Sequence, residues 1–198
     1  MSKIIKRVKT YCTNLITTSK CKELPYHNID HTQDVVDAVI EISKAAGISN
    51  NELKNCIIAA WFHDTGFSLS YKNHEYFSKK IAENFLEQEL FKRDQIKVVL
   101  SCIEGTKLGE KPISNLEKII CDADLYHLTE CNYIYRNTLL RKEWEIELGK
   151  IYSDKEWYEL NYKFLKDHFF YNNKNELNLN QKLNINIKKV ENLFSICS

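Results

Sequence analysis

Apolar residues recur along most of the chain at spacings of three and four, the period of an amphipathic helix. Residues 3–19 show this stripe clearly, at Ile4, Ile5, Val8, Tyr11, Cys12, Leu15 and Ile16. Only 5 Gly and 2 Pro interrupt the sequence, too few for a turn-rich β fold. We therefore expect an all-α protein, a helical bundle of about eight helices without strands.

The second expected helix carries a histidine near its start. Asp30 followed by Gln33 fits a capping box, which predicts a helix that begins near His31 and stops at Gly47. A charged histidine is unfavourable in the first turn, because it faces the positive end of the helix dipole. A role as a metal ligand therefore explains His31 better than a role as a charged surface residue.

The next helix ends in an adjacent histidine and aspartate. Its start is marked by Ser49 and Glu52, and the apolar residues 59–62 lead directly into His63 and Asp64. A neutral imidazole beside a carboxylate is an ordinary ligand pair for a divalent metal, and the apolar run would bury both. The alternative is a helix end that His63 and Asp64 merely cap.

The remaining pattern predicts further helices, over residues 73–91, 93–104, 114 to beyond 124, 131–151, 154–171 and 180–195. Residues 171–180 form a polar connector rich in asparagine. Asp124 continues the stripe of Leu116 and Ile120, so it should face the core, whereas Asp122 should lie nearer the rim. A carboxylate that faces an apolar interior needs a partner, and a metal ion is one.

The bulk composition sets limits on the function. A chain of 198 residues that is 43% hydrophobic fits one domain, and a net charge of +1 gives no argument for nucleic-acid binding or for an acidic membrane surface. The 7 cysteines are odd in number and scattered without a C-x-x-C spacing, which is typical of a reducing compartment. With no apolar run long enough to span a membrane or to serve as a signal peptide, we expect a cytoplasmic protein.

The ordered set His31, His63-Asp64 and Asp124 resembles the H…HD…D ligand pattern of the HD-domain metal-dependent phosphohydrolases, an all-helical superfamily. The segment Tyr-His-Asn-x-x-His that ends at His31 is similar to the cyclic-nucleotide phosphodiesterase branch. The sequence around the HD pair looks more like small stand-alone phosphohydrolases. The resemblance covers about residues 24–145, and residues 146–198 carry no motif. We expect residues 1–198 to form a single HD-type domain.

The resemblance implies a divalent metal held by His31, His63, Asp64 and Asp124. Two imidazoles and two carboxylates suit Mn²⁺, Fe²⁺, Co²⁺, Ni²⁺, Zn²⁺ or Mg²⁺, and the residues alone do not select among them. The metal would activate a water molecule for attack on a phosphate ester. His74 could hold a second metal bridged through Asp64, or simply begin a helix.

The leaving oxygen needs a proton donor. Some relatives carry a glutamate three residues after the HD aspartate, where this chain has Phe67. His27 is the first candidate for the general acid, and Glu75 and Asp122 are alternatives.

Two basic residues are candidates for contact with the substrate phosphate. They are Lys107, in the loop segment of residues 107–112, and Arg141, in the segment Leu-Arg-Lys-Glu-Trp of residues 140–144. Arg141 stands close to Glu143, so it could equally form a surface ion pair.

These residues favour a phosphohydrolase that acts on a small phosphorylated substrate, a nucleotide or a nucleotide-derived signal. The alternative is a regulatory HD module that binds metal or nucleotide without turnover. A di-iron oxygenase would need more histidines between Asp64 and Asp124, where only His74 occurs. The sequence does not define the oligomeric state.

Overall fold

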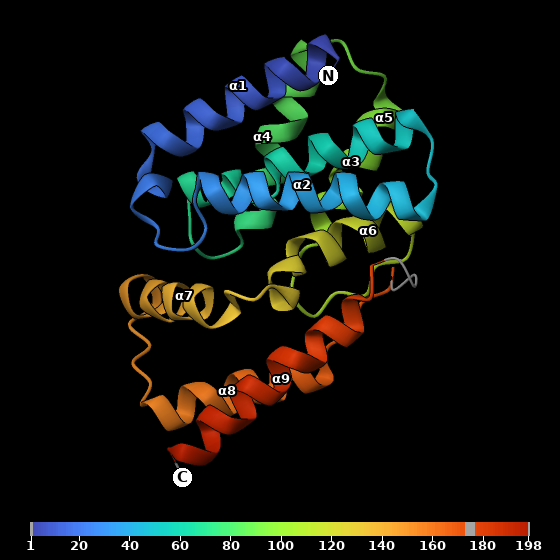
Figure 1. Cartoon of the computed structure of the whole chain (residues 1–198). Helices are drawn as coiled ribbons and strands as arrows, with labels where there is room; N and C mark the ends of the chain where they lie inside the picture. Colours follow the sequence, from blue (N-terminus) through green and yellow to red (C-terminus); the bar gives the residue numbers. More distant parts are fainter. Residues whose placement is uncertain (1, 173–176, 198) are drawn as a thin grey trace. The chain divides into compact units, whose positions relative to one another are not determined.

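A computed structural model describes residues 2–172 and 177–197 of the chain (Figure 1). Within these residues it contains nine α-helices, three short 3-10 helices and no strand. The prediction of an all-α helical bundle is therefore confirmed, with nine helices in place of about eight. Part of the predicted polar connector, residues 173–176, lies outside the described residues.

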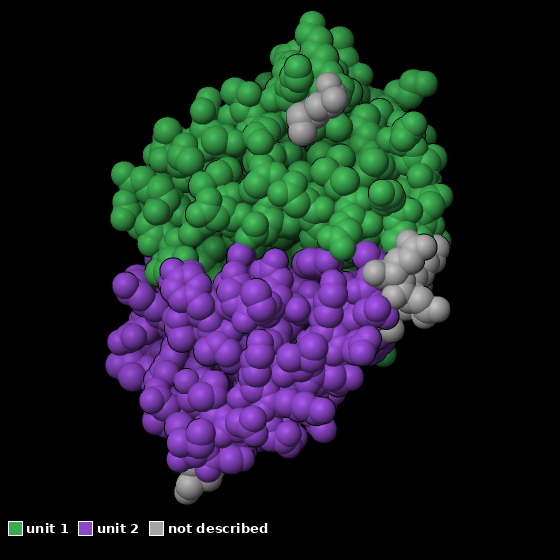
Figure 2. Space-filling view, in the orientation of Figure 1, with its two compact units in different colours: residues 1–124 green, residues 125–198 purple. Residues whose placement is uncertain are grey.

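The chain divides into two compact units, residues 1–124 and 125–198 (Figure 2). The elements of the first unit are α1 (Lys3–Thr18), η1 (Lys20–Glu23), α2 (Ile29–Ala46), α3 (Asn50–Phe62), η2 (Thr65–Ser68), α4 (His74–Gln88), α5 (Arg93–Glu104) and α6 (Asn115–Asp124). Those of the second are η3 (Tyr126–Thr129), α7 (Tyr133–Leu148), α8 (Asp154–Asp167) and α9 (Leu179–Ile196). The single-domain expectation stays a prediction, because compactness does not measure independent folding.

Helix α3 forms the centre of the first unit. All residues from Asn55 to Phe62 are buried. The helix packs against α1, α2, α4, α5 and α6, and Figure 1 shows it beside α2. A helix that is apolar on every side is stable only when neighbours cover all of it. This burial brings the end of α3, and the His63-Asp64 pair that follows, into the interior of the unit.

The start of α2 differs from the expectation. Asn28 is the N-cap, and its Oδ1 accepts hydrogen bonds from the N–H groups of Asp30 and His31 at 2.9 and 3.4 Å. The capping role predicted for Asp30 was wrong by two residues. Asn28 has the extended backbone of an N-cap (φ −117°, ψ −169°), whereas Asp30 already lies inside the helix. The predicted stop at Gly47 is confirmed, with φ 68° in the left-handed region.

The predictions for α6 were right at its start and wrong at its end. Ser114 Oγ accepts from the Glu117 N–H at 3.2 Å, as a cap should, but the helix ends at Asp124. Asp122 was expected near the rim and is instead fully buried, whereas the Asp124 side chain is 20% exposed. The reason is that α6 packs against α2, α3 and α5, which cover more of its circumference than one stripe.

In the second unit α8 packs against α9, and buried polar groups join α7 to α8. The Trp157 indole N–H donates to Asn137 Oδ1 at 2.6 Å, and the Asn137 amide donates to Asn161 Oδ1 at 2.5 Å. Tyr133 O–H donates to the same Asn161 oxygen at 3.2 Å. These bonds satisfy side chains whose burial would otherwise be costly.

Two further findings concern membrane-spanning helices and the state of the cysteines. No described helix combines the length and the apolar character needed to cross a membrane. All seven cysteines are free thiols.

The two possible caps of α2 can be separated by mutation. Asn28→Ala should lower the free energy of unfolding by about 1 kcal/mol, because two N–H groups of the first turn lose their acceptor. Asp30→Ala, which removes no capping bond, should cost less than half of that. Urea denaturation followed by circular dichroism measures both. Equal losses would contradict the assignment of Asn28 as the cap.

Candidate metal centre

Four histidine and aspartate side chains from three helix ends meet inside the first unit. His31 lies in the first turn of α2, and Asp124 is the last residue of α6. His63 is the C-cap residue of α3, and Asp64 follows it directly. We call His31, His63, Asp64 and Asp124 the His/Asp cluster.

The polar atoms of the cluster converge on one point. His31 Nε2 lies 3.1 Å from Asp124 Oδ1 and 3.3 Å from Asp64 Oδ2. His63 Nε2 lies 3.4 and 3.1 Å from the same two oxygens, and the two Nε2 atoms are 3.4 Å apart. Neighbouring ligands at about 2.1 Å from a cation are roughly 3.0 to 3.4 Å apart in octahedral or tetrahedral coordination. The spacing therefore fits a single divalent cation.

A hydrogen bond on the ring nitrogen that does not face the cluster fixes the orientation of His63. Its Nδ1 lies 2.7 Å from the backbone oxygen of Ala60. A carbonyl oxygen can only accept a hydrogen bond, so Nδ1 carries a proton and Nε2 is the nitrogen that a metal would coordinate after losing its own proton. A metal-binding histidine commonly has such a bond on its other nitrogen.

The buried Asp64 Oδ2 makes no well-formed hydrogen bond, although two imidazole nitrogens lie near it. This oxygen is inaccessible to solvent. Leaving a buried carboxylate oxygen without a partner is costly. Since the nearest atoms are the Nε2 atoms of His31 and His63, a cation shared by these groups would supply what the site lacks.

The electrostatics of the cluster favour a cation. Burial by itself lowers the pKa of His31, but the carboxylates of Asp124 and Asp64 outweigh it and raise the pKa above its usual value. The pKa of His63 is raised in the same way. Burial would raise the pKa of Asp124, yet His31 and His63 hold that pKa well below its usual range. The two carboxylates thus stabilise positive charge where the four side chains meet, either as protons on the imidazoles or as a bound cation that replaces them.

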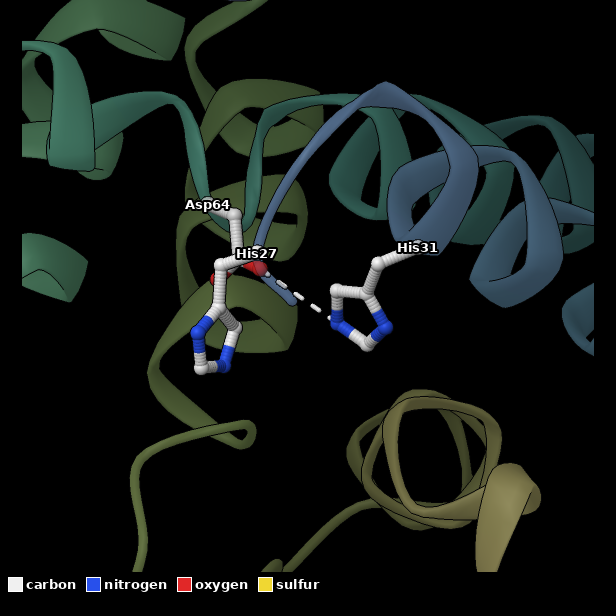
Figure 3. A group of neighbouring side chains, drawn as sticks. All are labelled: His27, His31 and Asp64. Atoms are coloured by element: carbon white, nitrogen blue, oxygen red, sulfur yellow. Dashed lines mark ion pairs between the residues drawn. The ribbon is translucent and has the colours of Figure 1, made fainter. Parts of the chain in front are cut away.

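His27 lies beside the cluster. One ligand atom from each of His27, His31 and Asp64 lies within 4.8 Å of the others, and His27 is only partly buried. Figure 3 shows both imidazole rings beside the Asp64 carboxylate, with the ion pair between His31 and Asp64 dashed. His27 therefore lies within reach of a group bound at the cluster.

His74, in the first turn of α4, approaches the other oxygen of Asp64, and Glu75 lies next to His74. His74 Nε2 lies 3.6 Å from Asp64 Oδ1 and 3.6 Å from Glu75 Oε1, too long for hydrogen bonds. The His74 ring stacks on Phe67, with centroids 3.8 Å apart and planes at 16°. The sequence drew attention to Phe67 only because some relatives have a glutamate at that position. It gave no sign that the Phe67 ring supports the His74 ring.

Asp122 and Lys107 were also candidates for the active site from the sequence. Asp122 is buried within α6. Lys107 forms ion pairs with Glu104 at 3.6 Å and Glu110 at 3.2 Å, and its substrate role stays a prediction.

Arg141 belongs to the second unit. Its guanidinium donates to Asp154 Oδ1 at 2.6 Å and to the backbone oxygen of Tyr152. This ion pair corresponds to the structural alternative, with Asp154 as the partner. A substrate role for Arg141 stays a prediction.

Comparison with protein-family models gives one match, the HD domain, over residues 28–129. This is just over half of the chain, and the protein belongs to the HD-domain family. HD-domain proteins form a superfamily of metal-dependent phosphohydrolases. The His/Asp cluster of this chain supplies residues that could hold a divalent metal. Comparison with curated proteins and with solved structures gave no significant match.

The first test of the cluster is removal of single ligands. His63→Ala and Asp124→Asn should each weaken binding of Mn²⁺ more than about 100-fold, since even residues that only support ligands contribute about 10- to 100-fold. The helical circular dichroism signal should persist, because the packed helices supply most of the stability. Isothermal titration calorimetry on protein stripped of metal measures the affinity.

Two controls accompany these variants. His168→Ala removes a histidine of the second unit whose burial lowers its pKa to about 4, and Asp122→Asn alters the neighbouring buried carboxylate of α6. Both should retain Mn²⁺. Metal retained at full stoichiometry in His63→Ala and Asp124→Asn would refute the cluster as the binding site.

Proposed function

We propose that this protein is a phosphohydrolase that cleaves a phosphate ester of a nucleotide or a nucleotide-derived signal in a metal-dependent reaction. The observation that carries the proposal is the convergence of four side chains of metal-binding type on one buried point, with the imidazole nitrogens of His31 and His63 at 3.3 and 3.1 Å from Asp64 Oδ2. Membership of the HD-domain family supports phosphohydrolase chemistry in general. Family membership does not define the substrate, so the nucleotide or nucleotide-derived substrate is part of the proposal.

His31, His63, Asp64 and Asp124 would hold the metal. When bound, a divalent ion of this kind lowers the pKa of water and offsets negative charge on a phosphoryl group. The mixed nitrogen and oxygen donors suit Mn²⁺, Fe²⁺, Co²⁺, Ni²⁺ or Zn²⁺. Burial of the two imidazoles limits the access of bulk water to the ligands.

His27 is the proposed general acid. It adjoins His31 and Asp64 and is partly exposed, so a substrate can reach it from solvent. Its ring lies edge-on to Tyr26, with centroids 4.7 Å apart, and 4.7 Å from the Phe67 ring, contacts that restrict its orientation. Glu75 is the remaining alternative. Asp122 is a poor candidate, because it is fully buried and a general acid must reach the leaving oxygen.

The proposal is tested by metal analysis followed by a substrate panel. Purified protein loaded with Mn²⁺ should hydrolyse at least one member of a panel of nucleoside monophosphates, cyclic nucleotides and dinucleotides. Treatment with EDTA should abolish turnover, and Mn²⁺ should restore it. Bound metal without turnover of any ester would instead support the regulatory module that binds metal without catalysis.

The role of His27 can be tested through the leaving group. His27→Ala should retain the metal and the substrate affinity while it lowers kcat about 10²- to 10⁴-fold on a ribose ester, the usual range for a positioned acid. A p-nitrophenyl ester should be nearly unaffected, because p-nitrophenolate leaves without a proton. Steady-state kinetics on both esters measures the difference.

Glu75→Gln provides the comparison for His27. It should lower kcat on the ribose ester much less than His27→Ala does. The opposite ranking would transfer the acid role to Glu75. Equal losses of His27→Ala on both esters would contradict a role in proton donation and indicate positioning instead.

A further inference from the structure

A buried serine of α4 occupies a capping position that Asp64 leaves open. Ser78 is fully buried, and its Oγ accepts a hydrogen bond from the backbone N–H of Gly66 at 2.8 Å. Gly66 is the second residue of η2. At the start of a helix, the N–H of the second or third residue is ordinarily bonded by the side chain of the N-cap residue.

Asp64 is the N-cap residue of η2, yet its side chain makes no capping hydrogen bond. Its backbone has φ −105° and ψ 1°. Ser49 and Ser153, which do cap helices in this chain, are extended, with ψ 157° and 164°. The Asp64 carboxylate is directed instead toward His31 and His63.

Close packing holds Ser78 against Gly66. A Cβ atom on Gly66 would lie 1.9 Å from the backbone oxygen of His74 and 2.7 Å from the backbone nitrogen of Ser78. Both are backbone atoms of α4, which cannot move aside cheaply. Only glycine therefore permits this approach, and the approach places the Ser78 hydroxyl on the Gly66 N–H.

We propose that Ser78 is a positioning residue for the metal ligand Asp64. By accepting the Gly66 N–H in place of the Asp64 carboxylate, the Ser78 hydroxyl leaves that carboxylate directed at the His/Asp cluster. The inference rests on the proposed metal centre, and it assigns to Ser78 a role that does not involve contact with the metal or the substrate.

The test is the Mn²⁺ affinity of Ser78→Ala in the full-length chain. Without the hydroxyl, the buried Gly66 N–H has no acceptor, which is a costly state. A change of the Asp64 backbone to the extended conformation of Ser49 and Ser153 would let the Asp64 carboxylate accept this N–H, at the expense of its place in the cluster. The Mn²⁺ affinity should fall about 10- to 100-fold, the usual effect of losing a group that orients a ligand. Isothermal titration calorimetry measures the affinity, and an unchanged value would overturn the proposal.

Ser43→Ala is the matched control. Ser43 is also buried and lies on α2, the helix that carries His31, but its Oγ forms no hydrogen bond with any described residue. Its replacement should leave the Mn²⁺ affinity unchanged. Should Ser78→Ala fail to fold, Ser78→Cys serves in its place, because a thiol fills similar space and is only a weak acceptor.

A second measurement, on metal-free protein, separates positioning from a general loss of stability. Ser78→Ala should lower the urea midpoint less in the native background than in an Asp64→Ala background, since only the former retains a carboxylate that can take the Gly66 N–H. Equal shifts in both backgrounds would overturn the proposal.

The two proposals fail in different ways. Wild-type protein that binds none of Mn²⁺, Fe²⁺, Co²⁺, Ni²⁺ and Zn²⁺ would overturn the metal centre and, with it, the role of Ser78. Normal binding by the wild type and by Ser78→Ala would overturn the role of Ser78 alone.

Discussion

The buried charge of Asp64 is the constraint on which the first unit depends. A carboxylate below the surface is tolerated only when positive charge or hydrogen-bond donors surround it. Here two imidazoles face one of its oxygens and His74 approaches the other. The surrounding helices place these groups, with α3 delivering Asp64, α2 presenting His31 and α4 presenting His74.

The geometry around Asp64 also explains how a fold built from ordinary helix packing can assemble a candidate metal site. Each ligand lies at a helix end, where the chain can change direction and side chains from separate helices can meet. Residues behind the ligands fix their orientation, as the Ala60 carbonyl does for His63. The metal-binding atoms therefore need little rearrangement before a cation binds, which lowers the entropic cost of binding.

The sequence predicted the fold class and the residues that meet in the His/Asp cluster because both have local signals. Helical spacing and the rarity of glycine and proline predicted the bundle, and the family pattern singled out His31, His63, Asp64 and Asp124. It failed where the outcome depends on tertiary contacts. The cap of α2 depends on the backbone conformation of Asn28, and the burial of Asp122 depends on the three helices around α6. The hydrogen bond between Ser78 and Gly66 joins residues 12 positions apart on different elements, and no local sequence pattern predicts it.

The four residues of the His/Asp cluster all precede Leu125, where the second compact unit begins. Substitutions in residues 125–198 therefore leave the coordinating atoms themselves unchanged. Surface residues of the second unit can therefore vary while the residues that would bind the metal stay the same.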